Sequence, residues 1–180
     1  MPELINPDPR VHRSFLVAVA EFKAEGRGQA DDRTMLGEEI HRFGRLWPDP
    51  VAFARYVARQ RAMAFEKTPP REGFAPVTNM WLVDGDEFLG RIAIRHSLTP
   101  ILLEAGGHIG YDIRPSARRK GYATQMLRAA LPVSFGLGID PALITCDVDN
   151  IASRRVIERN GGVLEDQRKE KLRFWVPTTP

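Results

Sequence analysis

The sequence predicts an α/β protein with a mixed sheet flanked by helices. Three observations support this class. In the first 65 residues, apolar side chains recur every three or four positions, which is typical of amphipathic helices. From residue 79 onwards, short β-rich runs replace this period, as strands do. After residue 122, helical and strand patterns alternate, an order typical of helices packed on a sheet.

Two helices are expected before the first clear strand. The first carries an apolar stripe over residues 11–22 and is stopped by two glycines. A loop is expected over residues 26–50. Pro50 suits the start of the second helix, because a residue in the first turn needs no free amide. The apolar stripe of this helix covers residues 51–65, and Pro69-Pro70 is expected to end it.

The next elements are strands. Residues 80–83 and 88–96 are expected to form a hairpin, because the turn-forming sequence Asp84-Gly85-Asp86 joins them. In the second of these strands, Gly90, Ile92 and Ile94 alternate with Arg91, Ala93 and Arg95. One face of the strand is therefore expected to be buried and the other, with the arginines, exposed to solvent.

A further strand is expected over residues 108–114, after a loop over residues 97–107. Pro115 ends this strand because proline cannot donate to a strand ladder. A helix is then expected over residues 122–131, and Pro132 limits how far it runs undisturbed.

The last third of the chain is expected to form a strand over residues 142–148 and a helix over residues 151–159. Asn160-Gly161-Gly162 closes that helix, because glycine accepts the left-handed conformation that ends many helices. Two short final strands are expected over residues 163–165 and 171–176.

Composition narrows the function classes. A chain of 180 residues fits one domain. It carries 26 Lys and Arg against 23 Asp and Glu, a net charge of +3, which requires neither a nucleic-acid nor a membrane partner. The single Cys146 excludes an internal disulfide framework and a multi-cysteine zinc site, and it suits the cytoplasm. Neither a signal peptide nor a membrane-spanning run is expected.

An anion site is expected where the strand over residues 108–114 gives way to the next helix. The free amides and the positive end of the helix dipole converge there, and a glycine lets the backbone approach a ligand closely. The glycine is Gly121, and the three cations before it are Arg118, Arg119 and Lys120. These cations supply more charge than one phosphate uses, which favours a pyrophosphate. A solvated basic turn is the alternative. The glycine patterns of P-loop and dinucleotide-binding folds are absent.

Two blocks of the sequence resemble the GNAT superfamily of acetyl-CoA-dependent N-acetyltransferases. Arg118-Arg119-Lys120-Gly121-Tyr122-Ala123 is similar to the family pattern [QR]-x-x-G-x-[GA], which follows a strand and begins a helix. Thr145-Cys146-Asp147-Val148-Asp149-Asn150-Ile151-Ala152-Ser153 is similar to the family's strand and N-x-x-S segment. The resemblance covers roughly residues 77–176. The run GGHIGYDIRPSARRKGYAT looks like a poorly characterised bacterial branch.

The resemblance implies a single domain over residues 1–180, with N-terminal helices and acceptor-side loops in 1–76 and the sheet and cofactor core in 77–176. It implies a mostly antiparallel sheet in which two parallel strands splay apart and receive the pantetheine arm of acetyl-CoA between them. The resemblance assigns cofactor binding to Tyr111, Asp112, Ile113, Arg118, Arg119, Lys120, Gly121, Tyr122, Ala123, Thr124, Asn150 and Ser153. For Asn150 and Ser153, helix capping is the alternative.

The resemblance also implies direct acetyl transfer, with the backbone amide of Ile113 stabilising the oxyanion. The sequence departs from the family at the general base, because Gly107 stands where some relatives have glutamate. His108 is the leading candidate, since imidazole has a suitable pKa, and Glu104 and Asp112 are the others. A merely packed imidazole is the alternative for His108.

A second departure concerns the leaving group. Ile157 stands where many relatives have a tyrosine that protonates the thiolate. Tyr111 or Tyr122 could substitute, or the thiolate could leave without a dedicated acid. Cys146 is expected to be a buried core thiol rather than an acetyl carrier.

The expected function is therefore acetyl transfer from acetyl-CoA to a primary amine of a small molecule, a peptide or a protein, without a metal. Segments 26–50 and 97–107 are expected to contact the acceptor, and acidic residues in the first hint at a cationic one. A homodimer is left open. Two alternatives remain: a non-catalytic acyl-CoA sensor, and a nucleic-acid-binding domain that uses Arg114, Arg118, Arg119, Lys120 and Arg128.

Overall fold

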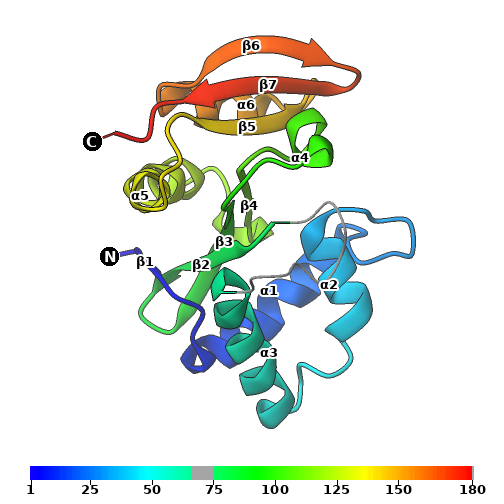
Figure 1. Ribbon diagram of the computed structural model, residues 1–180. Helices are drawn as coiled ribbons and strands as arrows, with labels where there is room; N and C mark the ends of the chain where they lie inside the picture. The colour runs from blue at the N-terminus through cyan, green and yellow to red at the C-terminus, as the bar shows by residue number, and fades with distance from the viewer. Residues whose placement is uncertain (66–74, 180) are drawn as a thin grey trace.

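A seven-stranded sheet forms the centre of the protein in the computed structural model, which describes residues 1–65 and 75–179. The strands lie in the order β1-β2-β3-β4-β5-β7-β6 (Figure 1). Neighbours run antiparallel except β4 and β5, which are parallel, so the expected mixed and mostly antiparallel sheet is confirmed. The strands are β1 (Glu3–Ile5), β2 (Val77–Asp84), β3 (Glu87–Arg95), β4 (Ile109–Ile113), β5 (Ala142–Asp147), β6 (Val163–Arg168) and β7 (Lys171–Val176).

Helices cover both faces of this sheet. In Figure 1, α1, α2 and α3 lie together beside β2 and β3, whereas α5 and α6 lie near β4 and β5. The α-helices of the described residues are α1 (His12–Ala24), α2 (Met35–Phe43), α3 (Pro50–Ala62), α4 (Pro100–Glu104), α5 (Tyr122–Gly136) and α6 (Ile151–Arg159). Three single turns of 3-10 helix lie at Pro9–Val11, Met63–Phe65 and Pro115–Ala117.

The sheet separates two hydrophobic clusters. One lies between the sheet and α1–α3 and is rich in aromatic rings, with the centroid of Phe15 5.4 Å from that of Trp81. The other lies between the sheet and α5 and contains Leu82 and Met126. Trp81 and Leu82 belong to different clusters because successive strand residues point to opposite faces. The strands at the centre of the sheet are therefore buried on both sides.

This double burial corrects the expectation for β3. Arg91 and Ala93 were expected to face solvent, but Arg91 is 2% exposed and Ala93 is completely buried. The helices α1–α3 cover the face that these residues occupy, and the guanidinium of Arg91 has an acidic partner there. Alternation correctly separated the two faces of the strand, but the tertiary fold decided that both are buried.

Helix α2 corrects the expectation of a loop over residues 26–50. The hydroxyl of Thr34 caps the helix by accepting a hydrogen bond from the Gly37 amide at 3.1 Å. Leu36 and Ile40 are buried against α1 and α3. Leu36, Ile40 and Phe43 recur at steps of four and three, so the sequence did carry a helical pattern here, which the expectation of a loop overlooked.

Other elements also differ from expectation. Strand β1 lies in the proline-rich start and pairs with β2, and α4 lies in the expected loop over residues 97–107. Helix α5 continues through Pro132 to Gly136, and Leu131 and Val133 on both sides of that proline are partly buried against the core. The expected helix stop at Pro69-Pro70 lies outside the described residues, and α3 ends at Ala62.

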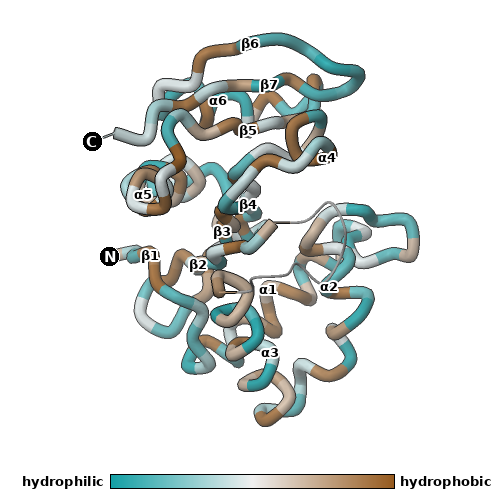
Figure 2. Tube along the Cα trace, viewed as in Figure 1, coloured by the Kyte–Doolittle hydropathy of each residue, from teal (hydrophilic) through white to brown (hydrophobic). Residues whose placement is uncertain are grey.

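Strand β6 forms one edge of the sheet and is longer than expected, ending at Arg168 rather than residue 165. Its first two residues, Val163 and Leu164, are apolar and exposed, and the remainder is polar. In Figure 2 the strand accordingly changes from brown to teal along its length. The bounds of β7 and α6 agree with those expected from the sequence.

Candidate functional site

The parallel strands β4 and β5 separate soon after they meet. Among the described residues, Ile109 and Ile144 are the register partners of this pair. On its other side β4 is fully paired with β3 from Ile109 to Ile113. Beyond the Ile109–Ile144 pair, the edge of β4 that faces β5 therefore has no paired strand beside it in the described part of the chain. This splay is the one expected from the resemblance.

The strand ladder determines which backbone groups of β4 face the splay. The Arg95 amide donates to the His108 carbonyl, and the Arg114 amide donates to the Leu89 carbonyl. In an antiparallel pair the backbone groups of only every second residue bond to the partner strand. The backbone amides and carbonyls of the even-numbered residues of β4 therefore point toward β3. The backbone groups of Tyr111 and Ile113 consequently point toward the gap, where an extended ligand could pair with them.

The expected anion loop follows β4 and begins α5. Gly121 is the N-cap residue of α5, has a φ of 83°, and offers no side-chain cap. A Cβ built on Gly121 would meet no atom within 4 Å, so the approach to this amide is open. Arg119 also has a positive φ, of 61°. The first amides of α5, from Tyr122 to Thr124, have no acceptor within their own helix and lie at its positive end.

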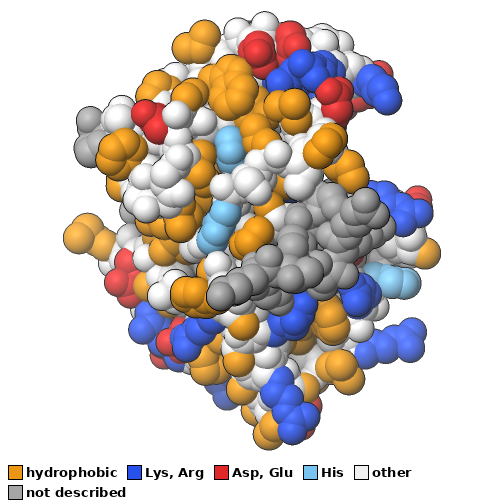
Figure 3. Space-filling model, in the orientation of Figure 1, with side chains coloured by type: hydrophobic (Ala, Val, Ile, Leu, Met, Phe, Trp, Pro, Cys, Tyr) orange, Lys and Arg blue, Asp and Glu red, His pale blue; other side chains and the backbone are white. Residues whose placement is uncertain are grey.

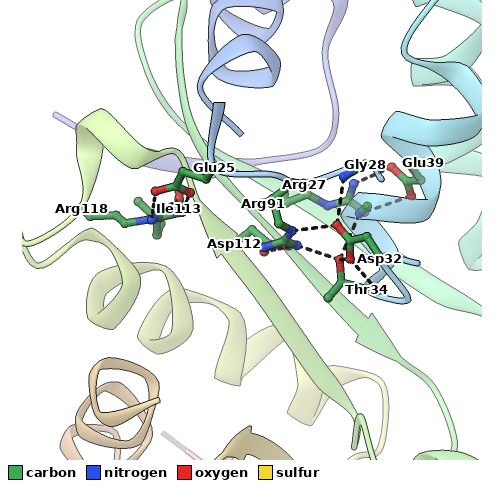
Figure 4. A network of polar contacts seen from close by, with 11 residues as sticks. Glu25, Arg27, Gly28, Asp32, Thr34, Glu39, Arg91, Asp112, Ile113 and Arg118 are labelled. Carbon is green, nitrogen blue, oxygen red and sulfur yellow. Dashed lines mark hydrogen bonds and ion pairs between the residues drawn. The ribbon is translucent and has the colours of Figure 1, made fainter. Parts of the chain in front are cut away.

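Arg118 is engaged elsewhere than expected. Its guanidinium makes two hydrogen bonds with the Glu25 carboxylate, at 2.7 and 2.8 Å, and its Nε donates to the Ile113 carbonyl at 3.1 Å (Figure 4). These contacts join the end of α1 to the end of β4. In this structure Arg118 thus braces the loop, and Arg119 and Lys120 are further exposed cations beside it.

At the N-terminus of α6, the capping alternative describes the contacts of Asn150 and Ser153. Asn150 Oδ1 accepts a hydrogen bond from the Ser153 amide at 3.0 Å. The Ser153 hydroxyl lies 2.7 Å from the Tyr111 hydroxyl, so α6 and β4 touch at the splay. Burial raises the pKa of Tyr111, and the Ser153 contact offsets this only in part, so the phenol stays neutral.

His108 lies at the start of β4 and is 8% exposed. Its Nδ1 accepts a hydrogen bond from the Leu143 amide at 2.9 Å, which assigns the ring proton to Nε2. Burial and the nearby charge of Arg95 lower the pKa of His108 to about 4. The lone pair that a general base needs is therefore occupied. This geometry favours the packed alternative over a base role for His108.

The other two candidate bases have different surroundings. Glu104, at the end of α4, is exposed and forms an ion pair with Arg168 on β6. Asp112 lies on β4 directly before Ile113, and its side chain is 22% exposed. Because it is the register partner of Arg91, it points to the face covered by α1–α3.

A loop between α1 and α2 contacts Asp112 through Arg27, which sequence reasoning missed. The Arg27 guanidinium lies 3.2 Å from both Asp112 and Asp32 and 2.8 Å from the Thr34 hydroxyl (Figure 4). Although burial raises the pKa of Asp32, hydrogen bonds from Thr34 and Gly28 and the charge of Arg27 hold it below its usual value. A local signal existed, since an aspartate side chain commonly accepts from the amide two residues on, as Asp32 does from Thr34.

Cys146 is buried on β5, and burial followed by the charge of Asp147 raises its pKa. Its surroundings are those of a core thiol. Within residues 1–65 and 75–179, no group of three His, Cys, Asp or Glu side chains is placed to hold a metal ion. None of the helices in those ranges combines the length and apolar character that crossing a membrane requires.

Surface charge bears on the nucleic-acid alternative. On the face shown in Figure 3, Lys and Arg side chains are scattered, and several lie beside acidic ones. Two of the five cations expected to form a basic surface are in ion pairs, since Arg114 contacts Glu21 and Arg118 contacts Glu25. A nucleic-acid site needs a continuous basic patch, which this arrangement does not favour.

Residues 29–163 match the family model described as the acetyltransferase (GNAT) domain. The match covers well over half of the chain. The splayed strands and the glycine-headed helix described above are the features that the resemblance implied for this family. The chain therefore belongs to the GNAT acetyltransferases.

Solved structures of other acetyltransferases share the fold. RimL, a ribosomal L7/L12 alpha-N-protein acetyltransferase in complex with coenzyme A, has a TM-score of 0.62 and 20% identity, covering 97% of this chain and 92% of its own. The ribosomal-protein-S5-alanine acetyltransferase from Vibrio fischeri has a TM-score of 0.68 and 11% identity, with coverage of 98% and 93%.

The microcin C7 self immunity acetyltransferase MccE, in complex with acetyl-CoA and AMP, has a TM-score of 0.62 and 11% identity, with coverage of 98% and 92%. At these identities the likeness concerns the fold alone. No curated protein matches the chain significantly by sequence.

Proposed function

We propose that this GNAT acetyltransferase transfers the acetyl group of acetyl-CoA to a primary amine. The observation that carries the proposal is the splay between β4 and β5 with an open helix N-terminus beside it. RimL and MccE, which share the fold, were solved with coenzyme A and acetyl-CoA respectively. The site offers backbone pairing groups to an extended chain and free amides to a diphosphate.

Backbone groups do most of the binding in this proposal. Tyr111 presents its amide and carbonyl to the pantetheine arm, which acts as a substitute strand. The Ile113 carbonyl already accepts from Arg118, and the Ile113 amide is left for the oxyanion. The amides of the turn that starts at Gly121 receive the diphosphate, and the helix dipole favours its negative charge. Arg119 and Lys120 add positive charge at the rim, whereas Arg118 braces the loop.

The reaction forms a C–N bond and breaks the thioester C–S bond. The amine must attack in its neutral form, because an ammonium group has no lone pair. The Ile113 amide points into the gap and stabilises the oxyanion of the tetrahedral intermediate. The thiolate leaves and takes a proton from solvent, since the Tyr111 hydroxyl is engaged with Ser153.

We assign proton acceptance to Asp112, directly or through a water molecule. It precedes the oxyanion donor on the same strand and faces α1–α3, where the loop of Arg27 lies. Asp112 and Glu104 are both in ion pairs, but Asp112 adjoins the oxyanion donor Ile113, whereas Glu104 lies at the exposed end of α4. The acceptor lone pair of His108 is occupied. The proton released by the amine therefore reaches a carboxylate on the acceptor-facing side of β4.

The test is an amine panel with acetyl-CoA and detection of the released thiol. The panel contains peptides with free N-termini, a lysine peptide with a blocked N-terminus, a polyamine and an aminoglycoside. We expect turnover with at least one class. Calorimetric binding of acetyl-CoA without turnover by any amine would instead indicate the sensor alternative, and absence of binding would contradict the proposed site.

A further inference from the structure

The closed end of the splay is held by two hydrogen bonds between the same two residues. The His108 amide donates to the Leu143 carbonyl at 2.7 Å, and the Leu143 amide donates to His108 Nδ1 at 2.9 Å. In an ordinary parallel ladder the Leu143 amide would donate to a backbone carbonyl of the neighbouring strand, but here it donates to a side-chain nitrogen. One residue further along, Ile109 lies opposite Ile144, and beyond that pair the strands diverge.

The residues before His108 hold the chain tightly against β5. A Cβ on Gly107 would lie 2.4 Å from the Leu143 carbonyl oxygen, and the φ of Gly107 is 61°. The Gly106 amide donates to the Thr145 hydroxyl at 3.0 Å. Arg95 donates to the carbonyls of Gly106 and Gly107, at 3.1 and 3.2 Å. The approach of β4 to β5 is therefore determined at this point by close contacts from several directions.

We propose that His108 is a positioning residue that sets the width of the cofactor gap by holding the Leu143 amide where β4 and β5 begin to separate. This inference rests on the proposed function, because it concerns the gap into which the pantetheine arm inserts. The imidazole touches neither the acceptor nor the thioester in this arrangement. It acts through Leu143, which precedes Ile144 on β5.

Two properties suit the ring to this task. It is almost completely buried, so water does not compete for the hydrogen bond. Burial and Arg95 keep the pKa low, so the ring stays neutral and Nδ1 remains an acceptor at neutral pH. A protonated ring would point an N–H group at the Leu143 amide and open the closed end of the splay.

Three substitutions at residue 108 separate positioning from general-base catalysis. In His108→Asn, the amide oxygen lies as far along the side chain as Nδ1 and can accept from Leu143. In His108→Gln the oxygen lies one bond farther, in the position of Nε2, and His108→Ala has no acceptor. Tyr56→Phe is the control, because it removes a buried hydrogen bond to Glu39 on the other side of the sheet.

The first readout is the dissociation constant for acetyl-CoA, measured by calorimetry. We expect His108→Asn to bind like wild type and His108→Gln and His108→Ala to bind about tenfold more weakly, the size expected for one lost hydrogen bond. The control should bind normally even where its thermal stability falls. Equal affinity in all three variants, or an Asn variant as weak as the Ala variant, would overturn the proposal.

The second readout is amide hydrogen exchange at Leu143, which does not depend on activity. Protection should persist in wild type and His108→Asn and fall in His108→Gln. If His108→Ala does not fold, the Asn and Gln pair still decides the question. A base role predicts a different pattern: all three variants would bind acetyl-CoA normally but lose turnover and the acidic limb of the pH profile, whereas positioning predicts that His108→Asn keeps both. Failure of wild type to bind acetyl-CoA would contradict the proposed function itself, a result distinct from all of these.

Discussion

Arg91 on β3 and Glu39 on α2 form a two-point ion pair, with nitrogen–oxygen distances of 2.5 and 3.2 Å. Arg91 is 2% exposed, and Tyr56 on α3 donates to the same carboxylate at 2.6 Å. The pair therefore joins the sheet to the helical layer that carries the Arg27 loop. A buried charge depends on its partner, since removing one member leaves the other uncompensated.

We expect Glu39→Gln to lower the free energy of unfolding by about 3–5 kcal/mol, because the buried Arg91 loses its counter-charge. Urea denaturation measures the change. Glu158→Gln is the matched control, since it breaks the exposed pair with Arg154 within α6 and should change stability little. Similar small effects in both variants would show that Arg91 finds another partner or water.

Gly121→Glu should abolish measurable binding of acetyl-CoA, because it places a carboxylate at the open N-terminus of α5. Gly138→Glu is a close control: Gly138 follows α5, has a φ of 78°, and also has no atom within 4 Å of a built Cβ. Both changes should cost about 1 kcal/mol of stability for the left-handed backbone. Normal affinity in folded Gly121→Glu would contradict the phosphate site.

Asn150→Ala and Asp49→Ala each remove a side-chain cap, the first from α6 and the second from α3. Both should lower stability by about 1 kcal/mol. Only Asn150→Ala should also reduce the rise in melting temperature that acetyl-CoA produces, because α6 contacts Tyr111 at the splay. An unchanged increment in Asn150→Ala would leave the residue with a capping role alone.

Acid should destabilise the protein through His108. The folded pKa of about 4 lies below the ordinary value of 6.5, so the unfolded chain binds more protons between these values. This stability is present above pH 6.5 and is lost as pH falls toward 4, to a total of about 3 kcal/mol. In His108→Asn the loss over this range should be smaller, although partly buried His96 contributes in the same direction in both proteins. Parallel curves of unfolding free energy against pH would contradict the assigned ring environment.

Asp112→Asn should lower kcat by about a hundredfold while the affinity for acetyl-CoA stays near that of wild type, because the change removes a base and not a cofactor contact. Asp32→Asn is the control, since it also removes an ion pair of Arg27 but lies in the loop before α2. An equal loss of kcat in both variants would indicate that Arg27, and not the Asp112 carboxylate, matters for turnover.

Features carried by short, contiguous segments were predictable. Helix α6 has the bounds expected from its sequence, because Asn150 caps its start and Asn160-Gly161-Gly162 follows its end. The loop before α5 was recognised because its glycine and its basic residues stand next to one another in the chain. Strand β1 was missed because three residues are too few to show a period and its partner β2 is distant in the chain. Helix α2 was missed although Leu36, Ile40 and Phe43 have helical spacing.

The sequence by itself determined the family, the mixed sheet and the glycine-headed basic loop before α5, since these depend on local motifs and on the order of elements. Only the tertiary structure decided what individual side chains do. Arg118 braces α1 instead of facing the anion loop, Arg91 is buried, and His108 holds Leu143. Each of these outcomes depends on a partner at least 35 residues away in the chain or on a covering layer. The sequence pattern around a residue shows what it can donate or accept, but only the packed fold supplies the group that it meets.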